Sequence, residues 1–136
     1  MYKTVIIPID ISHADRVKPM IEAAKQLGGK DTKYVLTSVI ENGPTYVEAQ
    51  IPAEIREKLN ADVREQLEAI ASESGLGPEI DVRNGQPANE ILALANEKGA
   101  DVIVVASHQP GFGDFLIGST AARVVRHASC SVHVLR

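Results

Sequence analysis

The sequence predicts an α/β protein, a doubly wound five-stranded parallel sheet with helices on both faces, and three observations indicate it. Strand-like stretches alternate with helical patterns along the chain, which is typical of a parallel sheet with right-handed crossovers. Some of these strands are almost continuously apolar, whereas others alternate between apolar and polar residues. The 136 residues suffice for one core, so a single domain over residues 1–136 is expected.

The predicted strands cover residues 4–9, 34–40, 79–83, 101–107 and 131–136. The first and fourth are almost continuously apolar, as central strands buried on both faces are. The third and fifth alternate, which is typical of edge strands with one wetter face. These hydrophobicity patterns predict the strand order 3-2-1-4-5, with the first strand in the middle. The last strand is then an edge that could pair with a second subunit.

Apolar residues at helical spacing predict four helices between these strands. Their apolar faces are Val17, Met20, Ile21, Ala24 and Leu27; Ile55, Leu59, Val63, Leu67 and Ile70; Ile91, Leu92 and Ala95, in a helix that starts at Pro87; and Ala121, Val124, Val125 and Ala128, in one that starts near Gly118. Residues 41–54 contain two prolines and show no period, so a long, mobile loop is expected there.

The composition narrows the classes of function. The net charge is −4, and no basic run exceeds two residues, which argues against nucleic acid as the main partner. No window approaches the roughly 18 consecutive apolar residues of a membrane span, and the N-terminus has the pattern of a first strand rather than of a signal peptide. The single Cys130 excludes an internal disulfide and is expected to be a small buried residue. These features predict a soluble, cytoplasmic protein.

Ligands of open α/β sheets bind beyond the carboxyl ends of the strands, where the strand order reverses. In the predicted order this place lies between the first and fourth strands, which are followed by Asp10 and by residues 107–119. Ser12 and Asp15 resemble a capping box with Asp in place of the usual Glu. That arrangement would leave Asp10 free to contact a ligand hydroxyl or ring; the alternative is that Asp10 only orders the turn.

Gly118, Ser119 and Thr120 open the last predicted helix, whose first N–H groups could bind an anion together with the two hydroxyls. The alternative is that Ser119 is merely an N-cap. No lysine lies between residues 99 and 136, and neither a Walker motif nor a dinucleotide-binding glycine pattern is present. The histidines lack metal-ligand spacing, and only His108 falls in the candidate site. No metal site, catalytic triad or carboxylate pair is expected.

Four segments together resemble the universal stress protein family: "VIIPIDIS" (5–12), "SVI" (38–40), "GQPANEIL" (85–92) and the whole of residues 104–136. The resemblance covers essentially the entire chain. It implies a doubly wound, adenine nucleotide alpha hydrolase-like fold and a bacterial cytoplasmic homodimer joined through residues 131–136. Many members of the family bind ATP, and others do not.

ATP-binding members carry a G-x-x-G element followed downstream by G-[ST], and this sequence keeps only the second part. Gly118 and Ser119 match the G-[ST] element, but Ala106 and Gln109 occupy the two earlier glycine positions. Residues 106–110, "ASHQP", resemble a branch of the family that has "ASH[RQ]P" at this place. A Cβ at these positions would hinder close contact between the backbone and a phosphate. Gly111 and Gly113 could take over this role from shifted positions in the loop.

The resemblance implies nucleotide contacts for a set of residues: Pro8, Ile9 and Asp10 at the adenosine, Val39 at the adenine, and Ala106, Ser107, His108, Gln109, Gly118, Ser119 and Thr120 toward the phosphates. Any Mg²⁺ would be held mainly by the phosphates and water. The expected function is an ATP-binding stress-response sensor or regulator with an unidentified regulatory protein partner, and with slow hydrolysis at most. The alternative is a nucleotide-free dimeric interaction module. A phospho-receiver is disfavoured, because the third strand ends in "RNGQP" and no late lysine exists.

Overall fold

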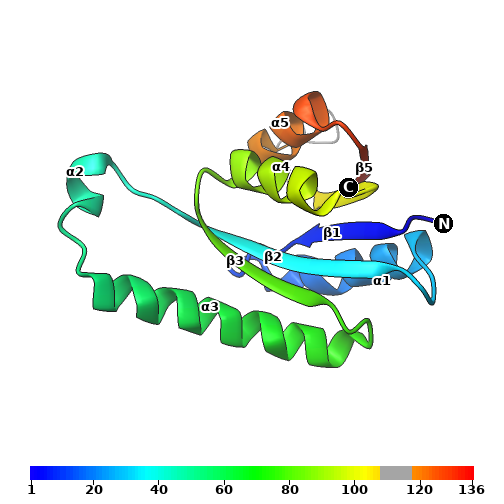
Figure 1. Ribbon diagram of the computed structural model, residues 1–136, viewed down its shortest axis with the longest axis horizontal. Coiled ribbons are helices and arrows are strands. Elements are labelled where there is room, and N and C mark those ends of the chain that lie inside the picture. The colour runs from blue at the N-terminus through cyan, green and yellow to red at the C-terminus, as the bar shows by residue number, and fades with distance from the viewer. Residues whose placement is uncertain (108–117) are drawn as a thin grey trace.

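The computed structural model describes residues 1–107 and 118–136, and its strands form one five-stranded sheet in the order β3-β2-β1-β4-β5 (Figure 1). The strands are β1 (Thr4–Pro8), β2 (Lys33–Glu41), β3 (Glu79–Gly85), β4 (Val102–Ala106) and β5 (Ser131–Leu135). Every neighbouring pair is parallel. The predicted fold class and strand order are therefore confirmed.

Burial along the strands agrees with the predicted central and edge positions. Val5, Ile6 and Ile7 of β1 are fully buried, and β4 is buried from Val102 to Val105. The edge strands β3 and β5 are only partly buried. Strands covered by helices on both faces need apolar side chains in both directions, which explains why the two central strands lack alternation.

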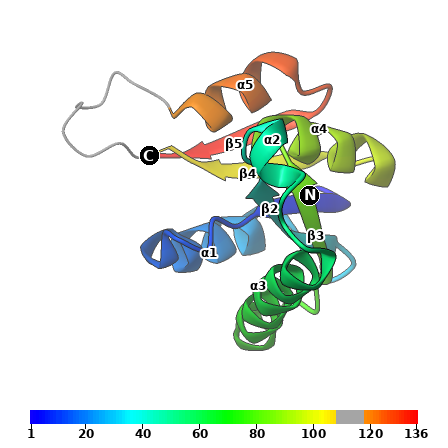
Figure 2. The same cartoon turned by 90° about the vertical axis from the view of Figure 1, so that its left-hand side faces the viewer.

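Helices cover both faces of the sheet (Figure 2). In chain order they are the 3₁₀ helix η1 (Ala14–Arg16), α1 (Val17–Leu27), α2 (Thr45–Glu48), α3 (Ala53–Ser74), α4 (Pro87–Lys98) and α5 (Ser119–His127). Successive strand residues point to opposite faces. Val5 and Ile7 therefore join a core with α1 and α3, while Ile6 joins a second core with α4 and α5.

The segment 41–54 is not the loop without helical structure that its two prolines suggest. It contains α2, one helical turn that follows Pro44, and α3 begins directly after Pro52. Proline is well suited to the start of a helix, where its missing N–H has no partner in any case. Glu48 of α2 accepts a hydrogen bond from the N–H of Gly43 and forms an ion pair with Arg56 of α3. These contacts hold α2 against the start of α3.

The apolar stripe predicted for residues 55–70 is only half covered. Leu67 is fully buried, and Val63 and Ile70 pack against the core, but Ile55 and Leu59 are about half exposed. The reason is length: α3 is much longer than the strands it covers, so its first turns extend past the sheet (Figure 1). Val125 of α5 is similarly exposed, whereas Leu94 of α4, absent from the predicted stripe, is fully buried.

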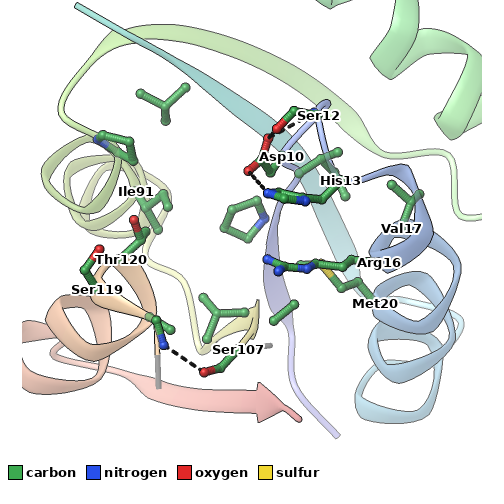
Figure 3. A pocket seen from close by; sticks show the side chains of 18 of the residues that line it. Asp10, Ser12, His13, Arg16, Val17, Met20, Ile91, Ser107, Ser119 and Thr120 are labelled. Carbon is green, nitrogen blue, oxygen red and sulfur yellow. Dashed lines mark hydrogen bonds and ion pairs between the residues drawn. The ribbon is translucent and has the colours of Figure 1, made fainter. Parts of the chain in front are cut away.

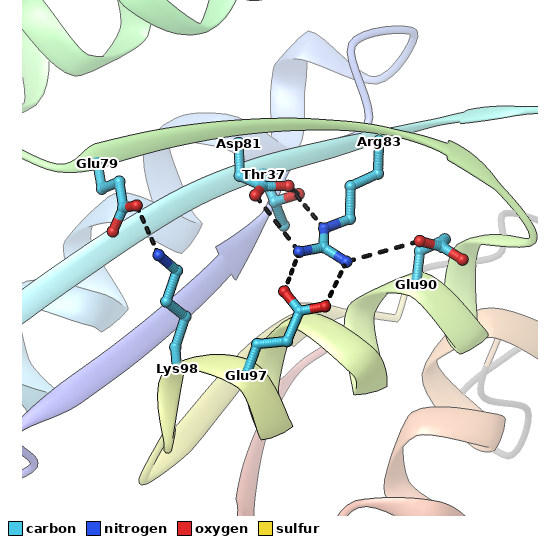
Figure 4. A network of polar contacts seen from close by, with 7 residues as sticks. All are labelled: Thr37, Glu79, Asp81, Arg83, Glu90, Glu97 and Lys98. Carbon is cyan, nitrogen blue, oxygen red and sulfur yellow. Dashed lines mark hydrogen bonds and ion pairs between the residues drawn. The ribbon is translucent and has the colours of Figure 1, made fainter.

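A network of charged side chains fixes α4 to the edge strand β3 (Figure 4). The guanidinium of Arg83 lies 2.7 Å from Asp81 Oδ1 and 2.5 Å from Glu97 Oε2. The next residue of α4, Lys98, places its ammonium 2.6 Å from Glu79 Oε1. Hydrogen bonding from Arg83 lowers the pKa of Glu97, and that from Lys98 lowers the pKa of Glu79. The ionised network thus holds α4, whose first turn borders the site described below.

Replacing Arg83 with alanine is expected to lower the free energy of unfolding at neutral pH, because its charge-assisted bonds to Asp81 alone are worth about 1–2 kcal/mol. The pKa of Glu97 is lowered, so its ion pair with Arg83 stabilises the fold above the ordinary glutamate pKa of about 4.3. This stabilisation is lost as the pH falls through the lowered pKa of the folded protein. Urea titrations at pH 7 and pH 3 should show a smaller difference from wild type in acid. The exposed Arg64→Ala is the control, and an equal loss at both pH values would contradict the prediction.

Candidate functional site

A pocket of about 780 Å³ lies at the carboxyl ends of the central strands (Figure 3). Its walls come from the ends of β1, β2 and β4, from η1 and α1 on one side, and from the first turns of α4 and α5 on the other. The volume is within the range of small-molecule sites. Its place, between the strands at which the sheet order reverses, is where open α/β sheets bind ligands.

Most residues that the sequence assigned to a ligand line this one pocket. They are Pro8, Ile9, Asp10, Val39, Ala106, Ser107, Gly118, Ser119 and Thr120. His108 and Gln109, and the compensating glycines Gly111 and Gly113, lie outside the described residues. The pocket therefore brings these predicted residues together from four separate segments of the chain.

Asp10 is held by a short turn after β1, and the capping box expected at Ser12 and Asp15 is wrong. The Asp10 Oδ1 atom accepts hydrogen bonds from the Ser12 N–H at 3.0 Å and from the Ser12 hydroxyl at 2.6 Å. The residue that precedes η1 is His13, and it makes no side-chain cap. The Ser12 hydroxyl reaches the nearer carboxylate two residues back instead, as Asp side chains commonly allow in turns.

The second carboxylate oxygen of Asp10 faces His13. Its Oδ2 atom lies 3.6 Å from His13 Nε2, and the Asp10 side chain is 58% exposed. One oxygen of Asp10 therefore orders the turn, and the carboxylate also borders the pocket, so ordering the turn does not remove it from the site. An ionised carboxylate there accepts hydrogen bonds and suits the hydroxyls of a sugar.

The opposite wall is the start of α5. Gly118 is the residue that precedes the helix, and Ser119 is its first residue, with no side-chain cap, so the alternative of Ser119 as an N-cap is wrong. The Ser107 hydroxyl, on a 95%-buried residue, accepts the Gly118 N–H at 2.9 Å. This bond ties the end of β4 to the start of α5. The Ser119 and Thr120 side chains border the pocket beside the positive end of the helix dipole.

Several pocket residues were not predicted from the sequence, chiefly His13 and Arg16 from the segment before α1 and Glu41 from the end of β2. A usable signal existed for the first two. Residues three apart in a 3₁₀ turn lie on the same side, so a ligand near Asp10 would also have been placed near His13 and Arg16. The apolar Met20 and Ile91 complete the floor from α1 and α4.

Other features of the described residues lie away from this pocket. Cys130 packs against the core between the sheet and α4–α5, and burial raises the pKa of its thiol. It was expected to be buried and is only partly so. Within residues 1–107 and 118–136, no cluster of three or more His, Cys, Asp and Glu is arranged to hold a metal ion. In the same two ranges, no helix combines the length and apolar character of a membrane span.

Comparison with known proteins places the chain in a family. The model of the universal stress protein family matches residues 1–136. The chain is 32% identical over 142 aligned positions to universal stress protein G of Escherichia coli O157:H7, with both sequences fully covered. It is also 32% identical to universal stress protein MJ0531 of Methanocaldococcus jannaschii, covering all of this chain and 83% of that protein.

Solved structures support the same fold. The hypothetical protein MJ0577 superposes with a TM-score of 0.81 at 24% identity, covering 99% of this chain and 96% of that one. A universal stress protein in complex with cAMP has a TM-score of 0.66 at 20% identity, covering 99% and 97% of the chains. One from Archaeoglobus fulgidus in complex with dAMP has a TM-score of 0.70 at 17% identity, covering 99% and 98%. At these identities the structures show the fold alone, and it is the match of the family model over residues 1–136 that decides: the chain belongs to the universal stress protein family.

Proposed function

We propose that this chain binds an adenine nucleotide, ATP, in the pocket at the ends of β1 and β4. The observation that carries the proposal is the pairing of two chemically different walls across one cavity. Asp10 on one wall suits ribose hydroxyls, and Ser119 and Thr120, at the start of α5, suit phosphate. The complexes of two family members with cAMP and dAMP support the same class of ligand.

The bound nucleotide acts as a regulatory signal rather than as the substrate of an efficient enzyme. The described lining residues include no lysine, the side chain that P-loop enzymes place on the transferred phosphates. Any Mg²⁺ is held mainly by the phosphates and water. We place this protein in the cytoplasm as a homodimer joined through the edge strand β5, with a regulatory protein as a further partner.

A second candidate, a nucleotide-free dimeric interaction module, is favoured by one observation. Ala106, at the end of β4, borders the pocket where the ATP-binding pattern of the resemblance has glycine. Its Cβ occupies space that a glycine leaves to the ligand. The two candidates differ in one measurable property, which is whether the purified protein carries or takes up a nucleotide.

The test is to denature freshly purified protein, identify any released nucleotide by chromatography, and titrate the stripped protein calorimetrically with ATP, AMP and GTP. We expect adenine-selective binding. The absence of both released nucleotide and heat at millimolar ATP would overturn the proposal and leave the interaction module as the better candidate.

Ser119→Ala should weaken ATP binding by about 10-fold, the lower end of the range that one hydrogen bond to a charged phosphate oxygen supplies. The matched control is Ser72→Ala, an exposed serine of α3 outside the pocket lining. We expect Ser72→Ala to bind ATP as wild type does. If the two variants bound ATP equally well, Ser119 would not be a ligand contact.

A further inference from the structure

Arg16 extends into the pocket from the last residue of η1 (Figure 3). Its guanidinium points from the α1 side toward the wall formed by Ser107, Ser119 and Thr120. Helix α1 packs on both β1 and β4, so a side chain at its start is well placed to reach the space between those strands. The residue is partly buried, which limits the water that competes for its hydrogen bonds.

The charges of the pocket are unevenly distributed. Two carboxylates lie at the carboxyl ends of neighbouring strands: Asp10 just after β1, and Glu41 as the last residue of β2. Among the described lining residues, Arg16 is the only arginine or lysine. A phosphate chain is repelled by the two carboxylates and attracted to the guanidinium and to the start of α5. The distribution therefore orients a nucleotide with its sugar toward Asp10 and its phosphates between Arg16 and α5.

Building on the proposed function, we propose that Arg16 binds the phosphates of the nucleotide and sets the preference of the site for ATP over nucleotides with fewer phosphates. A guanidinium presents a planar set of N–H donors that matches two phosphate oxygens at once. Each additional phosphate adds charge and acceptor oxygens on the side that Arg16 faces. Residues 99–136 contain no lysine that could bind the phosphates. Arg16 supplies this positive charge from the opposite side of the pocket.

The experiment compares calorimetric affinities of stripped wild type and Arg16→Gln for adenosine, AMP, ATP and inorganic pyrophosphate. We expect Arg16→Gln to lose about 10- to 150-fold in affinity for ATP, the range for a hydrogen bond to a charged group. The loss should be smaller for AMP and smallest for adenosine, so the ratio of ATP to adenosine affinity falls. Arg16→Lys should recover part of that ratio, because it keeps the charge and loses the planar fork.

The control is Lys18→Gln, which removes the same charge from an exposed residue of α1 outside the pocket lining. It should leave the ligand ranking unchanged, and a melting curve of each variant verifies that it is folded. An equal loss for adenosine and ATP in Arg16→Gln, or no loss, would overturn the role of Arg16 while leaving nucleotide binding intact. Failure of wild type to bind any adenine compound would overturn the proposed function itself. Pyrophosphate binding as tight as that of ATP would overturn the preference for a nucleotide, since it would identify a site for free phosphate.

Discussion

Asp10→Ala is expected to lower ATP affinity by about 100-fold while leaving the protein folded. Hydrogen bonds to a charged acceptor contribute about 1.5–3 kcal/mol each, and one carboxylate can accept from both ribose hydroxyls. Asp10 is 58% exposed and lies after β1 rather than within it, so the core does not depend on it. Calorimetric titration with ATP measures the affinity, and a urea titration measures the stability.

Ser12→Ala separates the two roles of Asp10. It removes the hydroxyl that donates to Oδ1 and leaves the backbone N–H that donates to the same atom. The turn is weakened but the carboxylate that would contact the ribose is kept. ATP affinity should therefore fall by about threefold or less, which is under 1 kcal/mol. Equal losses in Asp10→Ala and Ser12→Ala would mean that Asp10 acts only by ordering the turn.

The parts of the fold that could be predicted are those in which burial dictates residue type. β1 and β4 have helices on both faces, so their apolar runs already indicated the centre of the sheet, and the alternation in β3 and β5 indicated its edges. Because ligands of such sheets bind at the order reversal, Asp10 and the start of α5 could be placed at one site from chain position alone.

The parts that could not be predicted depend on competition between local contacts. The Ser12 hydroxyl had two carboxylates within reach, Asp10 and Asp15, and hydrogen-bonds the one that its pattern did not suggest. The helical period of residues 55–70 fixed one face of α3 but not how far the helix extends past the sheet, so Ile55 and Leu59 are exposed. Arg16 belongs to no motif, and its only signal was its three-residue spacing from His13 in the turn that η1 continues.

A second aspartate shows why residue type alone does not identify a site. Asp101 precedes β4, at the amino ends of the strands, whereas Asp10 follows β1 at their carboxyl ends. The Asp101 Oδ2 atom accepts the N–H groups of Lys3 and Thr4 at 3.1 and 2.8 Å. Its own N–H and C=O bond to Thr4 and Ser131. The Asp101 carboxylate therefore joins the starts of β1 and β4, and its backbone carbonyl adds the start of β5. The residue lines no part of the pocket.

Asp101→Ala should accordingly lower the free energy of unfolding by about 2–4 kcal/mol, because two backbone donors lose a charged acceptor. Asp101→Asn keeps one oxygen acceptor and should lose less. The ATP affinity of both variants should stay within about twofold of wild type, because changes at distant sites usually affect each other by no more than about 0.5 kcal/mol.

Urea titration and calorimetry on Asp101→Ala and Asp10→Ala should thus give opposite results: Asp101→Ala loses stability, and Asp10→Ala loses ATP affinity. If Asp101→Ala were as stable as wild type, the amino-end bonds would contribute nothing net. If it lost affinity as Asp10→Ala does, the two ends of the sheet would not be independent.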